Sequence, residues 1–316
     1  MKEFIIEKND SGQRLDKFIS KAVPDLPQSL MYKYIRLKRI KLNGKRCEIS
    51  TRLNVGDVLQ MYINDEFFGI NTEHEFLNVP YDIDVVYEDE NLLLVNKKCG
   101  MVVHEDNEKT ADTLINRITR YLYEKGEYDP ECEASFAPAL CNRLDRNTSG
   151  IVICAKNAQS LRLLNRIVKE REIVKNYLCI TLGTPEPTEA TLTAYLEKNE
   201  STNTVYVSDR KTPSNKTIIT KYKVIKSKGG LSLCEIDLIT GRTHQIRAHM
   251  AYIGHPLLGD GKYGKNQENR ARGIKTQALC AYKLTFDLKA DAGILNYLDG
   301  KSFEIKDIWF VKEYFK

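Results

Sequence analysis

The spacing of hydrophobic residues near the start of the chain predicts two short helices. Leu15, Phe18 and Ile19 fall on one face of a helix, which the segment PDLPQS then ends. Ser29 is a candidate N-cap for a second helix over residues 30–39, because its hydroxyl can accept a hydrogen bond from an unpaired backbone N–H. Each helix is therefore expected to pack one apolar face against a small core.

Turn residues and β-rich runs predict strands after these helices. A tight turn at Asn43-Gly44 lies in one such run, and Gly56 precedes another at residues 57–63. Helices and strands together predict a small α/β domain over residues 1–64. Residues 65–79 are acidic and lack a clear period, so a linker is expected there.

Residues 80–316 predict one larger domain. Residues 83–98 contain two β-rich runs joined by polar residues 89–91, which indicates a hairpin. Residues 113–123 and 159–169 have helical spacing, short strands are predicted in most of the remainder, and residues 303–315 alternate like a strand. The pattern favours an α+β fold with a single mixed sheet in this domain.

Composition narrows the class of protein. Of the 316 residues, 42% are hydrophobic and 29% are charged, which is typical of a soluble globular protein. No apolar run is long enough to span a membrane, and the N-terminus lacks the pattern of a signal peptide. The eight cysteines form no C-x-x-C pair, which favours reduced thiols in the cytoplasm and argues against zinc.

The basic charge is concentrated at the N-terminus. Residues 1–63 hold 13 Lys and Arg against 7 Asp and Glu, whereas the remaining residues hold 35 against 36. This asymmetry favours a polyanionic partner, with nucleic acid before acidic lipid. Lys33, Arg36 and Lys38 lie on the basic side of the second predicted helix and are candidate phosphate contacts, although a solvated basic face is the alternative.

The N-terminal domain resembles the small RNA-binding domain first seen in ribosomal small-subunit protein four. The features that match are Arg14-Leu15-Asp16, the basic helix, Asn43-Gly44 and Gly56-Asp57, in that order. The resemblance implies a unit that follows RNA phosphates without reading the base sequence.

Four motifs stand out in the larger domain. They are GMVVH at 100–104, NRLDRNTSG at 142–150, KNY at 175–177 and GRTHQIRAHMAYIGHPLLGDGKYG at 241–264. In this order they resemble the RluA-type family of RNA pseudouridine synthases. The resemblance implies a mainly antiparallel sheet and the isomerisation of uridine to pseudouridine. Because that reaction needs no redox step, no cofactor is expected.

The resemblance also implies roles for single residues. Asp145 is the expected catalytic carboxylate, paired with Arg247 in an ion pair that can be bidentate. Tyr177 is expected to stack on the target base and to help remove the proton from carbon five. Arg143 is expected to hold the RNA open around an extruded nucleotide. Further RNA-binding candidates are His104, Lys175, Arg242 and His244.

One motif residue departs from the family pattern. The histidine that usually opens the second motif is Asn142. If that histidine only bonds to the backbone, Asn142 can replace it, because both side chains offer a donor and an acceptor. If the histidine titrates during catalysis, the substitution puts activity in doubt. We favour the first interpretation.

The histidines of the fourth motif raise the question of a metal. His244 and His249 are five residues apart, which fits poorly with two ligands on one helical face, and Gln245 stands where a metalloprotease has Glu. No metal is predicted. These two histidines and His255 are expected to bond to the backbone around Arg247.

The predicted function is isomerisation of specific uridines in ribosomal RNA, with the large subunit favoured. The enzyme is expected to be cytoplasmic and monomeric, with structured RNA as its partner and no nucleotide cofactor. Transfer RNA remains open as the substrate. An inactive RNA-binding or ribosome-assembly factor is an alternative that only Asn142 favours. A glycoside hydrolase would need a second acid, for which Asp260 is the one candidate in the motifs, but its segment predicts a turn.

Overall fold

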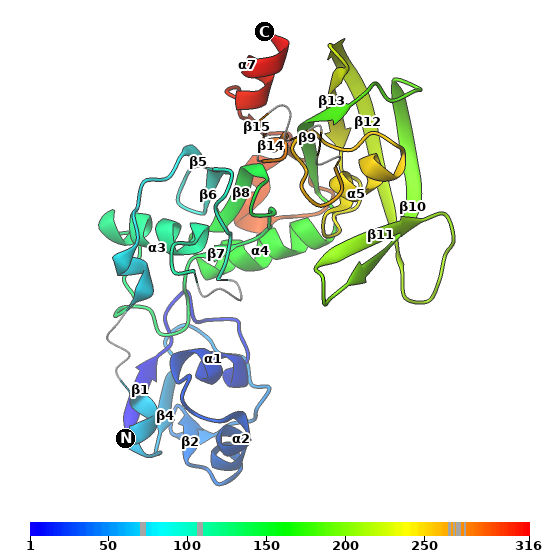
Figure 1. Cartoon of the computed structure of the whole chain (residues 1–316). Coiled ribbons are helices and arrows are strands. Elements are labelled where there is room, and N and C mark those ends of the chain that lie inside the picture. The colour runs from blue at the N-terminus through cyan, green and yellow to red at the C-terminus, as the bar shows by residue number, and fades with distance from the viewer. Residues whose placement is uncertain (70–73, 106–109, 265–266, 268, 270–272, 275) are drawn as a thin grey trace.

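The computed structural model contains two separate β-sheets (Figure 1). It describes residues 1–316 except 70–73, 106–109, 265–266, 268, 270–272 and 275. A four-stranded sheet uses residues 2–61, and an eleven-stranded sheet uses residues 85–304. No helix in the described part of the chain has the length and apolar character needed to cross a bilayer. The domain limits at residues 64 and 80 stay predictions.

The N-terminal sheet is antiparallel and carries two helices. Its strand order is β1-β4-β2-β3. The elements of this unit are β1 (Lys2–Ile5), α1 (Leu15–Ala22), α2 (Gln28–Arg36), β2 (Ile40–Leu42), β3 (Lys45–Arg46) and β4 (Val58–Met61). Leu15, Phe18 and Ile19 are fully buried, so the predicted apolar face of the first helix is confirmed.

The second helix begins earlier than predicted. The carbonyl oxygen of Pro27 accepts hydrogen bonds from the N–H groups of Leu30 and Met31, so α2 starts at Gln28. Proline suits this position because it lacks an N–H that would otherwise stay unpaired. The predicted cap at Ser29 is therefore wrong, since Ser29 lies inside the helix. The predicted turn at Asn43-Gly44 is confirmed, because both residues have positive φ angles between β2 and β3.

The large sheet is mainly antiparallel, as the family resemblance implied. Its order is β11-β10-β12-β13-β9-β14-β8-β6-β5, with β15 paired to β14 and β7 to β8. The pair of β14 and β8 is parallel. The strands are β5 (Val85–Glu88), β6 (Leu92–Lys97), β7 (Ala139–Leu140), β8 (Ser149–Ala155), β9 (Ile173–Leu182), β10 (Glu189–Asn199), β11 (Thr204–Ser208), β12 (Lys216–Lys228), β13 (Leu231–Asp237), β14 (Leu279–Phe286) and β15 (Ser302–Glu304).

Helices cover both faces of the β6–β8 part of this sheet. Leu92 and Leu94 on β6 belong to the core cluster that contains side chains of α4 (Ala158–Lys169). Leu93 and Val95, which point the other way, pack with side chains of α3 (Leu114–Glu124). Burial on both faces explains why β6 and β8 read as nearly unbroken apolar runs. The remaining helical elements are η1 (Asp65–Phe68), η2 (Glu75–Asn78), α5 (Gln245–Tyr252), η3 (Gly293–Leu298) and α7 (Trp309–Phe315).

The end of the chain differs from its prediction as a strand. The strand β15 ends at Glu304, and residues 309–315 form the helix α7. Phe310 and Phe315 on this helix are both buried in the main core. A short alternating run of apolar residues fits either structure, and here packing of the aromatic side chains against the sheet decides for the helix.

The N-terminal unit contacts the larger domain through its loop at residues 7–13. Asn9 donates a hydrogen bond to the Glu133 carboxylate at 2.6 Å and accepts one from the N–H of Ala158, the first residue of α4. The Ser135 hydroxyl donates to Asp10 at 2.6 Å. These bonds fix the position of the N-terminal unit relative to α4. In Figure 1 this unit lies at the lower end of the molecule, and α5 lies at the upper right.

Candidate active site

Asp145 lies in the loop that leads into β8, which lies between β14 and β6 in the large sheet. The Asp145 carbonyl accepts a hydrogen bond from Thr148 N at 3.0 Å, which closes a turn. The next carbonyl, that of Arg146, accepts bonds from Gly100 N and from the buried ammonium group of Lys97, both at 2.9 Å. The loop is thus fixed to the segment after β6, which carries the first sequence motif.

Gly150 allows β8 to approach β14 closely. Its φ angle is +124°, and a Cβ atom there would lie 2.4 Å from the carbonyl oxygen of Ala281. Only glycine avoids both the strained backbone angle and this clash. The glycine at the end of the second motif therefore brings the Asp145 loop against β14.

An ion pair joins Asp145 to Arg247, as predicted. The Nη1 atom of Arg247 on α5 lies 3.0 Å from Oδ2 of Asp145. The bidentate contact, however, is made with Asp260, whose two oxygens lie 2.7 and 2.9 Å from Nε and Nη2 of Arg247. Arg247 therefore bridges two carboxylates, and the expectation of a possible bidentate pair with Asp145 is wrong. The Asp260 side chain is 0% exposed, whereas that of Asp145 is 30% exposed.

The charges in this cluster stabilise one another. Burial alone would raise the pKa of Asp260, but hydrogen bonds and charge from Arg247, with the N–H groups of Lys262 and Tyr263, lower that pKa overall. Burial opposes the charged form of Arg247, yet its two carboxylate partners raise its pKa. Asp260 thus fixes a buried guanidinium whose Nη1 group donates to Asp145 at the more open side.

His244 also faces Asp145. Its Nε2 atom lies 3.8 Å from Oδ2 of Asp145, and its Nδ1 atom lies 2.8 Å from the hydroxyl of Tyr263. His244 precedes α5 and has a left-handed backbone with φ +52°. The structure thus brings together Asp145, Arg247 and His244, which come from two motifs about one hundred residues apart.

Tyr177 and Lys175 lie on β9 beside this cluster. They line one small pocket together with Asn142, which agrees with the prediction that they share a strand face. Burial and the charge of Asp145 raise the pKa of the Tyr177 phenol, and burial lowers the pKa of Lys175. Tyr177 is therefore a neutral phenol at physiological pH.

Asn142 makes the backbone bonds expected of it. Its Oδ1 atom accepts a hydrogen bond from Ile153 N at 2.8 Å, and its Nδ2 atom donates to the carbonyl of Ile151 at 3.4 Å. Both partners lie on β8. The substitution of asparagine for histidine at this position thus leaves a donor and an acceptor bonded to the strand that follows Asp145.

The other histidines of the fourth motif only partly follow the prediction. His255 Nδ1 lies 3.1 Å from the backbone carbonyl of Leu182, as expected. His249 Nδ1 instead lies 3.0 Å from the hydroxyl of Thr220. His244 likewise contacts a side chain, the Tyr263 hydroxyl. The expectation of backbone partners is therefore wrong for these two, because neighbouring elements place hydroxyl groups against them. No group of metal-ligating side chains occurs among the residues that the structure describes.

The remaining RNA-binding candidates divide between two places. Arg143 and His104 are both exposed beside the Asp145 loop, where burial and then the charge of Arg143 lower the pKa of His104. Arg242 is exposed in the turn before α5, where Gln245 accepts a hydrogen bond from its N–H. Lys33, Arg36 and Lys38 are exposed on and just after α2, which lies at the lower end of Figure 1, away from β8 and the loop that leads into it.

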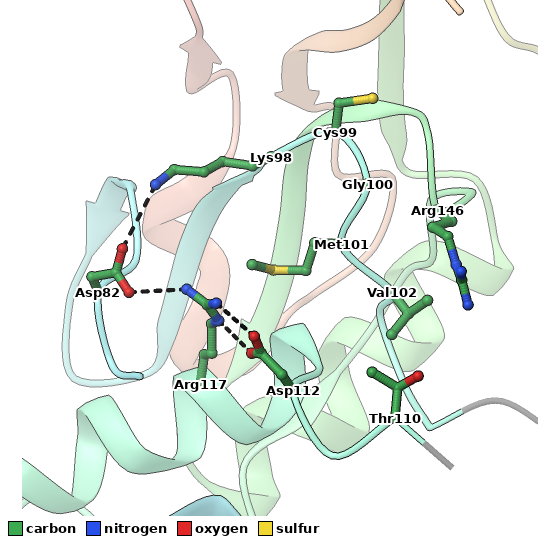
Figure 2. Close-up of a pocket in the computed structure, with 10 residues that line it drawn as sticks. All are labelled: Asp82, Lys98, Cys99, Gly100, Met101, Val102, Thr110, Asp112, Arg117 and Arg146. Atoms are coloured by element: carbon green, nitrogen blue, oxygen red, sulfur yellow. Dashed lines mark hydrogen bonds and ion pairs between the residues drawn. The ribbon is translucent and has the colours of Figure 1, made fainter. Parts of the chain in front are cut away.

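A pocket of about 580 Å³ lies beside the Asp145 loop (Figure 2). One wall carries Arg117, which pairs with Asp112 and Asp82. Arg146 lies across the pocket from these ion pairs, and the backbone of residues 98–102 lies between them. Asp145 is not among the residues that line it, so this pocket adjoins the Asp145 cluster without containing it.

Sequence reasoning missed three residues of this arrangement. The sequence around Asp260 predicts a turn, yet Asp260 is the bidentate partner of Arg247. The Tyr263 hydroxyl contacts Nδ1 of His244. Lys97 is fully buried and donates to three backbone carbonyls around the Asp145 loop. A signal for Asp260 was available, because an arginine on a buried helix needs a carboxylate partner.

Two family models match separate segments of this chain. Residues 91–252 match the family model described as RNA pseudouridylate synthase, and residues 13–59 match the S4 domain. A protein of Mycoplasma capricolum named an uncharacterized RNA pseudouridine synthase is 34% identical over 95% of this chain and 96% of its own. The ribosomal large subunit pseudouridine synthase C of Rickettsia conorii is 32% identical, covering 81% of this chain and 84% of its own.

Solved structures show the same fold. The human protein RNA Pseudouridylate Synthase Domain Containing 4 matches with a TM-score of 0.57 at 20% identity, over 72% of this chain and 89% of that one. The family model that matches, the similar relatives and the shared fold lead to the same conclusion. The chain belongs to the family of RNA pseudouridylate synthases and carries an S4 domain at its N-terminal end.

Proposed function

We propose that this chain converts specific uridines of ribosomal RNA, in the large subunit, to pseudouridine with Asp145 as the catalytic carboxylate. The observation that carries the proposal is the position of Asp145. It is partly open to solvent on one side and bonded on the other to Arg247, whose charge Asp260 holds in place. A carboxylate held in this way is both fixed in place and accessible, as nucleophilic assistance requires.

The reaction breaks the bond between the uracil base and its ribose and joins the two again through another atom of the base. The bond from N1 of uracil to C1′ of ribose breaks, the uracil turns, and a bond from C5 to C1′ forms. The proton on C5 is lost, and N1 gains one. Asp145 assists cleavage at C1′, and Tyr177 packs beside the base. The raised pKa of Tyr177 means that its hydroxyl acts as a neutral hydrogen-bonding group rather than as a phenolate.

The two groups of basic residues support separate tasks in RNA binding. Lys33, Arg36 and Lys38 on the N-terminal unit supply contacts to phosphates, which hold the RNA without reading its sequence. Arg143 stands exposed next to the Asp145 loop, where it supports an extruded nucleotide. Extrusion costs a few kcal/mol and costs least in a loop that is already single-stranded. An accessible loop uridine is therefore the proposed target.

The proposal that the substrate is ribosomal RNA rests on the names of similar proteins. Those from Rickettsia conorii and Vibrio vulnificus, each 32% identical, are named ribosomal large subunit pseudouridine synthase C. Transfer RNA remains the alternative substrate for the same chemistry. Support for an inactive RNA-binding factor rested on Asn142, and the backbone bonds of this residue weaken that case. The cytoplasmic location and the monomeric state stay predictions.

Mapping of pseudouridine across all stable RNAs tests the proposal. RNA from cells that lack the gene is treated with carbodiimide and read by primer extension, and is compared with RNA from cells complemented with the wild type or with Asp145→Asn. We expect sites in large-subunit RNA that the wild type restores and Asp145→Asn does not. Loss of sites in transfer RNA alone would contradict the ribosomal assignment, and an unchanged map would contradict the proposed function.

A further inference from the structure

The Tyr263 hydroxyl occupies a position between a backbone donor and a histidine ring. It accepts a hydrogen bond from the N–H of Val205 on β11 at 2.9 Å. It also lies 2.8 Å from Nδ1 of His244. The Val205 N–H is a donor, so of these two contacts only the ring nitrogen can accept the hydroxyl proton. Donation from the hydroxyl to Nδ1 satisfies both contacts.

This donation fixes the tautomer of His244. A neutral imidazole carries its proton on one nitrogen, and the partner of the other nitrogen decides which. Because Nδ1 accepts from Tyr263, the proton lies on Nε2. That nitrogen is 3.8 Å from Oδ2 of Asp145, which is a close electrostatic contact but longer than a hydrogen bond.

The backbone around His244 suggests that this orientation is built into the site. The residue adopts φ +52°, which costs free energy for any residue other than glycine, and its side chain is only 8% exposed. The Tyr263 ring is also held, since it packs with β10–β12 side chains and lies 5.3 Å below the Arg247 guanidinium. Both rings are thus fixed by neighbouring elements.

We propose that Tyr263 is a positioning residue that holds His244 as the neutral Nε2–H tautomer and so aims this N–H at Asp145. The proposal rests on the proposed function, in which Asp145 is the catalytic carboxylate. Without RNA this N–H stands 3.8 Å from Oδ2, and it reaches hydrogen-bond distance when the site tightens around the substrate. His244 then offers Asp145 a donor in addition to Arg247 without adding a second full positive charge. A carboxylate between two cations would be a weaker nucleophile than one that pairs with a single cation.

The charged groups around His244 are compatible with a neutral ring. Burial lowers the pKa of His244, and the charges of Arg247 on α5 and Lys262 in the following turn lower it further. The carboxylates of Asp145 and Asp260 act in the opposite direction. The Tyr263 hydroxyl favours the neutral form as well, because it can donate only to an unprotonated Nδ1.

Nitrogen-15 NMR of the histidine rings tests the tautomer without any substrate. The chain has five histidines, so the signal of His244 is assigned from its loss in His244→Gln. We expect protonation at Nε2 in the wild type, and a mixture of tautomers with a raised His244 pKa in Tyr263→Phe. A wild-type ring protonated at Nδ1, or a ring that Tyr263→Phe leaves unchanged, would overturn the proposal.

Single-turnover kinetics on RNA test the consequence for Asp145. Tyr263→Phe is expected to lower the rate roughly tenfold, the scale of one hydrogen bond at a charged group, with RNA affinity unchanged. The acid limb of its pH profile should move to higher pH, because the freed imidazole protonates more readily. Tyr222→Phe is the matched control, since it loses a hydroxyl bonded to the Pro187 carbonyl on the same sheet.

A double variant separates positioning from stability. In His244→Gln the amide places its NH₂ group where Nε2–H lies, and this donor does not depend on Tyr263. Adding Tyr263→Phe should then leave rate and pH profile unchanged, whereas a merely structural role would lower the rate in both backgrounds. An inactive wild type would count against the proposed function, while an active wild type with a normal Tyr263→Phe pH profile would count against this inference alone.

Discussion

Replacing Asp260 by asparagine is expected to destabilise the larger domain by about 3 kcal/mol. Removal of one partner of a buried ion pair costs about 3–5 kcal/mol, because the other charge loses its compensation. The Asp260 side chain is 0% exposed and makes two hydrogen bonds, of 2.7 and 2.9 Å, to Arg247. Arg247 keeps Asp145 as a second partner, which places the cost at the lower end of this range.

A surface pair with the same chemistry provides the control. Asp112 binds Arg117 through two hydrogen bonds, of 2.6 and 2.7 Å, but its side chain is 46% exposed. Asp112→Asn is therefore expected to cost no more than about 1 kcal/mol, as is usual for pairs that water screens. Both variants are compared by urea unfolding, followed through Trp309, the one tryptophan of the chain, which lies in the larger domain.

The effect of Asp260→Asn should depend on pH in a defined direction. Arg247 and two backbone N–H groups hold the pKa of Asp260 below its usual value of about 3.9, so the carboxylate stabilises the fold wherever it is ionised. The difference between wild type and variant should be complete above about pH 5. It should shrink as the pH falls through the lowered pKa. A cost as small as that of Asp112→Asn, or a difference that grows on acidification, would refute this reasoning.

Three further predictions address other parts of the molecule. Gly150→Ala should lower the free energy of unfolding by about 2–4 kcal/mol in urea titrations, because its Cβ would meet the Ala281 backbone at a positive φ; a near-neutral effect would contradict the close approach of β8 and β14. Asn142→Leu should cost about 1–3 kcal/mol by leaving Ile153 N unpaired, whereas Asn142→His should keep pseudouridine formation; loss of activity in Asn142→His would count against the equivalence of the two side chains. Joint replacement of Lys33, Arg36 and Lys38 by alanine should reduce the salt dependence of RNA binding, by about 0.7–0.9 in the log–log slope per lost phosphate contact, measured by filter binding; an unchanged slope would place the phosphate contacts elsewhere.

Local patterns in the sequence were enough for much of the fold. The buried face of α1, the turn at Asn43-Gly44 and the helices α3 and α4 all follow from short-range spacing and turn chemistry. The strand predicted over residues 303–315 failed because tertiary packing chose a helix for an ambiguous apolar run. The predicted start of α2 was wrong because the Pro27 carbonyl accepts the first hydrogen bonds of that helix.

The site was predictable where a motif carried the information. The Asp145–Arg247 contact joins residues 102 positions apart, and the family resemblance rather than any local pattern indicated it. The role of Asp260 was missed because its local sequence also fits a turn. Residues 260–264 do form a turn, in which the Asp260 carbonyl accepts a hydrogen bond from the N–H of Gly264. The partners of His244 and His249 depend on β11 and β12, whose positions relative to α5 no local spacing reports.

Release of tritium from carbon five of uridine tests the central claim most directly. Transcribed large-subunit RNA labelled at that position is incubated with excess enzyme, and tritium that passes to water is counted. Asp145→Asn keeps an oxygen that can accept from Arg247, so its urea unfolding and RNA affinity should match the wild type. The account predicts rapid release by the wild type and a rate lower by on the order of 10⁴-fold or more in Asp145→Asn. Release at a comparable rate by the variant would contradict a catalytic role for this carboxylate.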